Sequence, residues 1–315
     1  LTVPSNTGGG QADEASPGAA SISSYPESEG GASSQQIPGS VESLKNIEWF
    51  VPAATEATAD IPQRPEDENC QVNQVSAEPV RCEYGDVRGE TTIVLVGDSK
   101  VVQWQSALEE IADDQGWHMI SYTKSACAFS SGMQVASGKP YRSCAEWNEK
   151  VLDTVIDIQP DLVLTTNRVN EVMARPHDTG SRTKAAMVDA VSETWMDLKE
   201  AGIPVVSLLD NPSPGISVYE CVAENMDDLA ACTFDRDTGI DASSAPGHLE
   251  AAERVPGTRT VDLRESICPE PTCVPVIGNV LVYRQTSHIT NTYVMTLRPV
   301  LAEELVPVVQ ALASR

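Results

Sequence analysis

Short runs of β-branched and apolar residues alternate with amphipathic stretches over most of the chain after residue 90. The runs predicted to be strands are Thr91–Val96, Trp117–Tyr122, Asp161–Thr166, Ile203–Leu209 and Thr258–Leu263, with a further apolar run at Val280–Tyr283. The stretches predicted to be helices are Val101–Ala112, Ala145–Ile158, a segment that ends at Gly202, Ala245–Arg254 and Thr290–Ala313. Strands joined through helices lie parallel in one sheet, and the helices cover both of its faces. The alternation therefore predicts an α/β fold, a three-layer α/β/α sandwich with a central parallel sheet.

The cysteines predict loops that are pinned by disulfides. The eight cysteines fall into four pairs of sequence neighbours, Cys70–Cys82, Cys127–Cys144, Cys221–Cys232 and Cys268–Cys273. Many other pairings are combinatorially open, so this one is a hypothesis. A zinc site is the alternative, but no Cys-x-x-Cys occurs and the four histidines show no ligand spacing beside the cysteines. Disulfides indicate an oxidising, extracytoplasmic compartment. The stretch 210–239 is predicted to be a long loop of this pinned kind.

Charge and composition limit which partners and which domain organisation are possible. The formal net charge of −25 argues against nucleic acid and against an anionic membrane surface as partners. No apolar run approaches the roughly 20 residues that span a bilayer. Residues 1–69 are rich in Gly, Ser, Ala, Pro and Glu, which predicts an acidic, low-complexity linker or stalk before a globular domain at residues 70–315. A weak apolar patch at Ile47–Val51 is the part of this segment that could pack on the globular domain.

Three polar residues follow strands or precede a helix in a way that predicts a catalytic site. Ser99 ends the first strand in Gly97-Asp98-Ser99, Asn167 follows the third strand, and His288 precedes the last helix. Ligands of open parallel sheets bind at the carboxyl ends of the strands. There His288 would take the proton of Ser99, Ser99 would attack an acyl carbonyl, and the Ser99 amide and the Asn167 side chain would stabilise the oxyanion. This chemistry needs neither a metal nor a cofactor.

Each of these residues also has an ordinary structural interpretation. Ser99 could simply stand at a helix start, Asn167 could be a turn residue, and His288 could be a plain residue at the amino end of a helix. The Gly-x-Ser-x-Gly signature of the ordinary α/β-hydrolase elbow is absent. The prediction therefore depends on the three residues meeting at one edge of the sheet.

A set of short motifs resembles the SGNH family of serine esterases and acyltransferases. The motifs are Val96-Gly97-Asp98-Ser99 with Gln103-Trp104, Thr165-Thr166-Asn167, Thr123-Lys124-Ser125 leading into Cys127, Cys144 with Trp147, Cys268 and Cys273 before Val282-Tyr283-Arg284, and Ser287-His288-Ile289-Thr290. More narrowly, the set is similar to the SGNH domain fused to acyltransferase-3 membrane proteins, which O-acetylate cell-surface polysaccharides. The resemblance covers about residues 91–312. It implies an SGNH, flavodoxin-like arrangement of the α/β/α layers.

The resemblance implies an O-acyltransferase, in first place an O-acetyltransferase, that acts on a cell-surface or cell-wall glycan through an acyl-serine intermediate. The implied partners are a glycan acceptor, an acyl donor and a membrane acyltransferase-3 domain in the full-length protein, which would tether this domain at the cell surface. A secreted carbohydrate acetylesterase is the first alternative, because it uses the same chemistry. A non-catalytic glycan-binding domain of the same fold is the second.

The chain also departs from the family pattern. Gln285 stands where the family has the Asp of its Ser-His-Asp triad, three residues before His288. Three interpretations remain open. Ser99 and His288 could work as a dyad, Asp262 or Asp210 could supply the acid, or the enzyme could be weakened.

The family is named for four sequence blocks, around a Ser, a Gly, an Asn and a His. The chain also departs from the third block, around the Asn, and from the second block, around the Gly. Arg168 replaces the Asp of the third block, and together with Lys124 it is predicted to contact substrate. Gly132 and Gly138 are the only candidates for the Gly of the second block.

Overall fold

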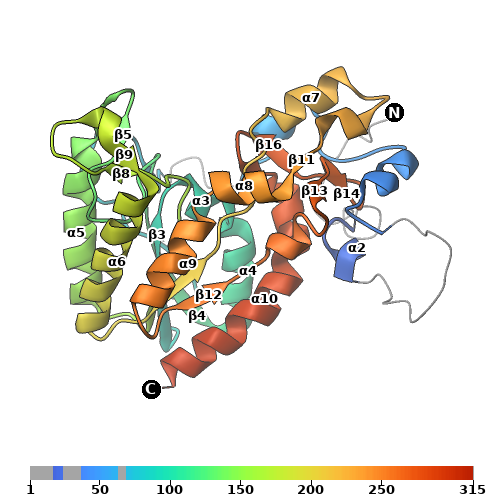
Figure 1. Cartoon of the computed structure of the whole chain (residues 1–315). Coiled ribbons are helices and arrows are strands. Elements are labelled where there is room, and N and C mark those ends of the chain that lie inside the picture. Colours follow the sequence, from blue (N-terminus) through green and yellow to red (C-terminus); the bar gives the residue numbers. More distant parts are fainter. Residues whose placement is uncertain (1–16, 24–36, 63–68, 315) are drawn as a thin grey trace. The chain divides into compact units, whose positions relative to one another are not determined.

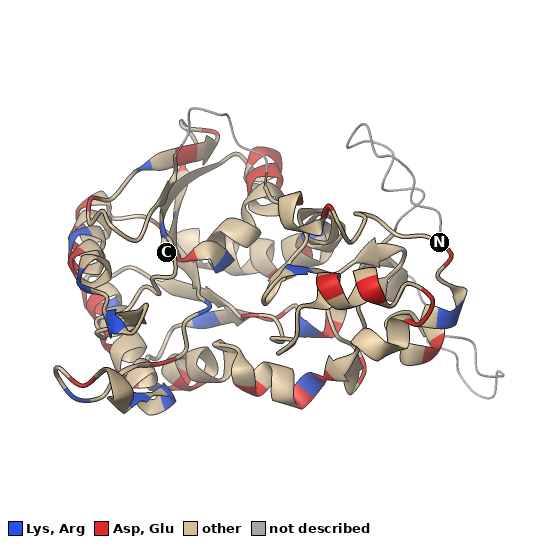
Figure 2. Ribbon diagram, turned by 90° about the horizontal axis from the view of Figure 1, so that it is seen from above, with Lys and Arg blue, Asp and Glu red and all other residues tan. Residues whose placement is uncertain are grey.

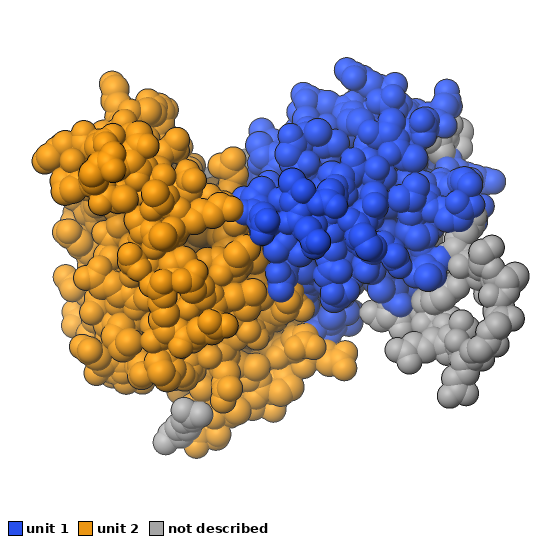
Figure 3. All heavy atoms as spheres, viewed as in Figure 1, with its two compact units in different colours: residues 1–62, 211–242, 263–300 blue, residues 63–210, 243–262, 301–315 orange. Residues whose placement is uncertain are grey.

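The computed structural model describes residues 17–23, 37–62 and 69–314, which fall into two compact units (Figure 3). Unit 1 comprises residues 1–62, 211–242 and 263–300, and unit 2 comprises residues 63–210, 243–262 and 301–315. Unit 2 carries the parallel sheet, and unit 1 is built from short hairpins and helices.

The sheet of unit 2 confirms the five predicted strands. They are β3 (Thr91–Gly97), β4 (Trp117–Lys124), β7 (Leu162–Thr166), β10 (Val205–Leu208) and β12 (Arg259–Val261), in the order β4-β3-β7-β10-β12 and all parallel. Two short strands complete the sheet on β4, β1 (Gln71–Val72) in parallel and β2 (Cys82–Gly85) in antiparallel. The chain leaves β3 towards β4 and later returns to the other side of β3 as β7. This reversal is the topological switch point at which doubly wound sheets bind ligands.

Helices flank the sheet of unit 2 (Figure 1). They are α3 (Ser99–Gln103), α4 (Gln105–Gln115), α5 (Arg142–Ile158), α6 (Lys184–Glu200), α9 (Ala245–Arg254) and the end of α10 (Asn291–Ala313). Val94 and Val96 of β3 pack with Trp147 of α5 and Trp195 of α6 in one buried cluster. Because side chains alternate along a strand, the neighbouring β3 residues face the opposite side of the sheet. The helix predicted from residue 101 begins at Ser99 and is interrupted at Trp104, where α3 ends and α4 begins.

All four predicted disulfides are present. Cys70–Cys82 and Cys127–Cys144 lie in unit 2, and Cys221–Cys232 and Cys268–Cys273 lie in unit 1. Each bridge closes a segment of 5 to 17 residues, so the bridges fasten individual loops. The loop closed by Cys127 and Cys144 contains a hairpin of β5 (Val135–Ala136) and β6 (Lys139–Pro140).

Unit 1 corrects the prediction of a single long loop over residues 210–239. This stretch contains the helix α7 (Val218–Glu224), a 3₁₀ turn at Leu229–Cys232 and the strand β11 (Phe234–Asp235), and most of the helix α8 (Arg236–Ala242). The strand β11 pairs with β13 (Thr272–Cys273). The apolar run at residues 280–283 belongs to two hairpins and not to the parallel sheet: β14 (Val276–Ile277) with β15 (Val280–Leu281), and β16 (Tyr283–Gln285) with β17 (His288–Ile289).

Part of the predicted linker is packed into unit 1. Phe50 is fully buried, and the main chain of Val51 exchanges hydrogen bonds with Asn279 and Leu281. The carboxylate of Asp60 accepts a hydrogen bond from the Thr292 amide, 3.0 Å away, at the amino end of α10. The apolar patch at residues 47–51 therefore does pack, as its sequence suggested. The predicted linker also contains the short helix α2 (Ala20–Ser23). Its residues 1–16, 24–36 and 63–68 lie outside the described residues.

Acidic and basic residues are spread over many elements of the described chain (Figure 2). Within the described ranges, no helix combines the length and the apolar content that crossing a bilayer requires.

Candidate active site

Asp98 ties the turn that carries Ser99 to the loop that carries Asn167. Asp98 is fully buried and caps α3, where its Oδ1 accepts a hydrogen bond from the Lys100 amide at 2.9 Å. Its Oδ2 accepts one from the Arg168 amide, also at 2.9 Å. Burial raises the pKa of Asp98 to about 6, against the effect of these two amide donors. A single carboxylate thus joins the segments that follow β3 and β7.

Gly97 permits the close approach of these two strands. It is paired with Thr166 in the sheet and adopts φ +154, a conformation that side chains disfavour. A Cβ atom at this position would lie 2.4 Å from the main-chain oxygen of Thr166. Asn167 follows Thr166 directly and Ser99 follows Gly97 after Asp98, so both lie at the carboxyl edge of the sheet beside the switch point.

A buried ion pair lies next to Ser99 in the sequence. Lys100 is fully buried, and its Nζ is 3.0 Å from Oδ1 of Asp210, which follows β10. Burial lowers the pKa of Lys100, and the Asp210 carboxylate opposes that shift. Asp210 was one of two candidates for a missing catalytic acid, but the structure pairs it with a lysine. The pair links the start of α3 to the end of β10.

Asn167 is buried and takes part in a chain of side-chain hydrogen bonds. Its Nδ2 donates to the main-chain oxygen of Val169 at 2.6 Å, and its Oδ1 lies 2.6 Å from Nε2 of His248. Nδ1 of His248 lies 2.7 Å from the hydroxyl of Ser207 on β10. Ser244, the cap of α9, donates a hydrogen bond to the Asn167 main-chain oxygen.

His248 was not predicted as a site residue. Burial lowers the pKa of its imidazole to about 4, so the ring is neutral at neutral pH. The sequence does hold one signal for it. Ala245, His248 and Ala251 recur at helical spacing on the buried face of α9, and a histidine on such a face needs polar partners.

His288 and Gln285 are paired across the β16–β17 hairpin of unit 1. Nδ1 of His288 lies 3.3 Å from the main-chain oxygen of Gln285 and 3.3 Å from the hydroxyl of Thr286. Asn211 supports the turn by donating to the main-chain oxygen of Ser287 at 2.9 Å. The Gln285 oxygen beside the ring therefore belongs to the backbone and not to the side chain that takes the place of the family's Asp. Gln285 itself is exposed.

Lys124 was predicted to contact substrate, and this role stays a prediction. Its side chain is buried, and its ammonium donates to the main-chain oxygens of Asn73 and Ser76 at 2.6 and 2.5 Å. These two bonds anchor the 73–76 loop and occupy two of the three N–H donors of the ammonium. Arg168, by contrast, has an exposed side chain, and its role stays a prediction.

Neither candidate glycine of the second block lies at the end of a sheet strand. A Cβ at Gly132 would meet Ala190 and Val172 at 2.8 Å, which marks tight packing against α6, and Gly138 forms the turn of the β5–β6 hairpin. Ala126, two residues after the end of β4, adopts a left-handed conformation with φ +51. A left-handed alanine is uncommon and marks a constrained turn.

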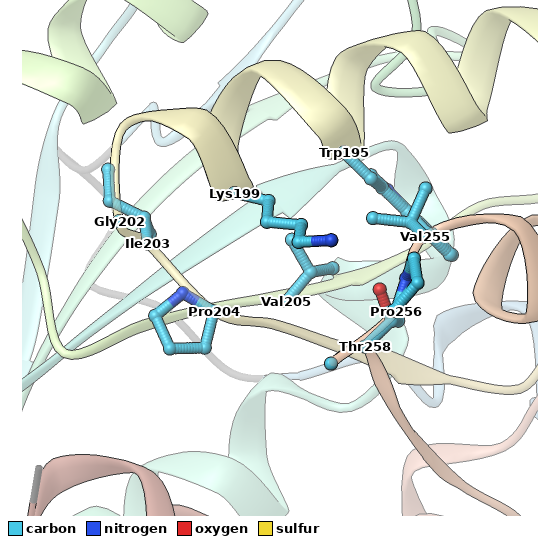
Figure 4. A pocket seen from close by; sticks show the side chains of 10 residues that line it. Trp195, Lys199, Gly202, Ile203, Pro204, Val205, Val255, Pro256 and Thr258 are labelled. Atoms are coloured by element: carbon cyan, nitrogen blue, oxygen red, sulfur yellow. The ribbon is translucent and has the colours of Figure 1, made fainter.

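A surface pocket of about 190 Å³ lies at the opposite edge of the sheet, at the amino ends of β10 and β12. It is lined by Trp195, Lys199, Pro204, Val205, Val255 and Pro256 (Figure 4). It shares no lining residue with the candidate site. Among the described residues, no group of three or more His, Cys, Asp or Glu side chains is arranged to hold a metal ion.

The parallel sheet, the serine turn at its switch point and the asparagine after the next strand define a domain of the SGNH type. The chain matches the family model of the SGNH domain fused to AT3 domains over residues 69–303, and it belongs to this family. Family membership supports an enzyme of the hydrolase and acyltransferase class.

The chain is similar to several solved structures at low sequence identity. The periplasmic domain of a lipopolysaccharide acetyltransferase from Salmonella ser. Paratyphi A matches with a TM-score of 0.53 and 17% identity, over 69% of this chain and 84% of that one. A GDSL-like lipase from Bacteroides thetaiotaomicron matches with 13% identity over 70% and 89% of the two chains, at a TM-score of 0.42. An acetyl xylan esterase matches with 13% identity over 69% and 98%, at 0.40. No curated protein matches the chain.

Proposed function

We propose that this domain transfers a short acyl group, in first place acetyl, to a hydroxyl of a cell-envelope glycan through an acyl-Ser99 intermediate. The observation that carries the proposal is the Asp98 carboxylate, which holds the Ser99 turn and the Asn167 loop together at the switch point. Family membership and the fold shared with the lipopolysaccharide acetyltransferase domain support it. In the full-length protein, an AT3 membrane domain would be the partner that presents the acyl donor. The four disulfides fit an extracytoplasmic site of action.

In the proposed mechanism, Nδ1–H of His288 donates to the main-chain oxygen of Gln285, which leaves Nε2 to act as the base. His288 takes the Ser99 proton as Oγ attacks the acyl carbonyl. The Ser99 amide and one N–H of Asn167 Nδ2 stabilise the oxyanion, while the other N–H of Nδ2 donates to the Val169 main-chain oxygen. Each oxyanion donor is worth roughly 3 kcal/mol of the barrier. The leaving oxygen of the donor departs with the proton from His288. The glycan hydroxyl then loses its proton to His288, attacks the acyl-serine and releases Ser99, which regains that proton.

The first test is covalent labelling of Ser99. A fluorophosphonate should label the wild-type protein on Ser99, as located by peptide mass mapping, and Ser99→Ala should abolish both the labelling and the release of acetate from an aryl acetate. Ser125→Ala is the matched control, because Ser125 follows the neighbouring strand β4. It should keep both signals. An unlabelled wild-type protein, or a Ser99→Ala variant that retains activity, would contradict the proposal and favour a non-catalytic glycan-binding domain.

Acceptor dependence separates transfer from hydrolysis. In the presence of a glycan acceptor, a transferase converts the acyl donor into acetylated glycan, whereas an acetylesterase produces only acetate. Mass spectrometry of the glycan after incubation distinguishes the two products. Rapid acetate release without any acetylated glycan would replace the transferase proposal with the esterase.

A further inference from the structure

His248 is a buried histidine that the proposed chemistry does not use. It is 2% exposed, and both of its ring nitrogens lie within hydrogen-bond distance of a side chain. The edge of the ring contacts Trp195, with the two ring centroids 5.2 Å apart. Burial of a polar ring is costly unless its nitrogens are satisfied, so the two hydrogen bonds account for its presence here.

The hydrogen bonds around Asn167 fix where the protons lie. Nδ2 of Asn167 faces the main-chain oxygen of Val169, which can only accept, so the amide is turned with Oδ1 towards His248. The ring must therefore carry its proton on Nε2 and donate it to Oδ1. Nδ1 is then an acceptor, and the hydroxyl of Ser207 donates to it. The two hydrogen bonds therefore point the same way, from Ser207 to His248 and from His248 to Asn167, and the imidazole ring is neutral.

Packing alone does not hold the amide of Asn167. Asn167 and His248 border a cavity of about 20 Å³, whose apolar walls include Met187, Val188 and Val191. The two ends of a carboxamide have nearly the same shape, so a steric fit cannot distinguish them, whereas a fixed donor can. In the flipped orientation, the amide would present an acceptor where a donor is needed.

We infer that His248 is the positioning residue that orients Asn167 for oxyanion stabilisation, an inference that rests on the proposed function. The helix α9 holds Asn167 twice. Its cap Ser244 binds the main-chain oxygen, and His248, one turn later on the same face, binds the side chain. Ser207 in turn fixes the tautomer of the ring. His248 does not touch substrate in this arrangement; it keeps Nδ2 of Asn167 in the donor position.

The test is a double-mutant cycle on aryl acetate hydrolysis. His248→Leu should lower kcat by about 10²-fold with KM nearly unchanged, since the affected donor acts in the transition state. In the Asn167→Ala background the same change should lower kcat no further, because the group that it positions is gone. His248→Gln keeps a donor near the Nε2 position and should recover most of kcat. Thr194→Val is the matched control: it removes another buried hydroxyl of the same helical layer and should leave kcat unchanged.

A spectroscopic readout makes the result independent of activity. In protein labelled with ¹⁵N on histidine and asparagine, His248 should show the Nε2–H tautomer, and the side-chain amide signal of Asn167 should shift in His248→Leu but not in Thr194→Val. The positioning role would be overturned if His248→Leu lowered kcat equally in the wild-type and Asn167→Ala backgrounds, or if it left the Asn167 amide signal unchanged. If the wild type proves inactive, the proposed function fails, and the amide signal and the tautomer alone decide whether His248 orients Asn167.

Discussion

At the scale of single residues, two buried titratable groups respond to acid in opposite directions. The pKa of His248 falls to about 4, below the usual value of roughly 6.5, so the unfolded chain binds this proton first as the pH drops. The stability that the neutral ring contributes is complete above pH 6.5 and is lost by about pH 4. The pKa of Asp98 rises to about 6, so its protonation favours the folded state over much of the same range. The acid response of the wild type alone therefore mixes the two.

A comparison of the wild type with a His248 variant isolates the contribution of this histidine to the pH dependence of stability. The difference in unfolding free energy between the wild type and His248→Gln should shrink by about 3 kcal/mol from pH 7 to pH 4, because the Asp98 contribution cancels. Denaturant titrations at pH 7, 6, 5 and 4 measure it. A difference that stays constant over this range would mean that His248 titrates normally in the folded protein.

At the scale of elements, the site depends on how closely β3 approaches β7. Gly97→Ala would force a Cβ against the main-chain oxygen of Thr166, which cannot move without breaking the sheet. We expect it to cost at least about 2 kcal/mol of stability and to separate Ser99 from Asn167, with loss of activity. Chemical denaturation and aryl acetate hydrolysis measure the two effects.

Gly116 provides the control for that substitution. It also has a positive φ, +66, but a Cβ there would meet nothing within 4 Å. Gly116→Ala should cost about 1 kcal/mol, the strain of the backbone alone, and leave activity intact. Equal costs at the two glycines would show that the contact with Thr166 is unimportant.

The elements that the sequence predicts well are those whose pattern is continuous. The strand β3 and the turn into Ser99 lie in nine adjacent residues, Thr91–Ser99, so the local apolar pattern and the Gly-Asp-Ser turn are enough to predict them. The helices α7 and α8 have seven residues each, which is too short for a helical period to stand out, so the sequence predicts a loop there.

Contacts between residues far apart in the sequence could not be predicted, for a different reason. The hydrogen bond between His248 and Asn167 joins residues 81 positions apart, and the carbonyls that bind Lys124 lie about fifty positions before it. A single sequence does not show which loop will supply a partner. The sequence therefore predicts neither the carbonyl partners of Lys124 nor the contact of His248 with Asn167.

At the scale of the whole molecule, the amino-terminal segment contributes to a folded unit. Phe50 is fully buried in unit 1, and a linker would leave it exposed. Phe50→Ala should destabilise the protein by about 3–5 kcal/mol, as expected when a large core side chain is removed. Ile37→Ala in the same segment is the control, since Ile37 is 45% exposed and should change stability by less than about 0.5 kcal/mol. Thermal unfolding of the two variants measures both, and a harmless Phe50→Ala would restore the linker interpretation of residues 37–62.

The short β16–β17 hairpin has a consequence for how this chain can vary. His288 stands opposite Gln285 across a turn of only Thr286 and Ser287, and Thr286 adopts a positive φ. Since neighbouring side chains of a strand point to opposite sides, one inserted residue in this turn would carry the imidazole to the reverse side of the ribbon while every sheet strand kept its place. The spacing of three residues between Gln285 and His288 is therefore fixed by the side of the ribbon on which the imidazole must lie.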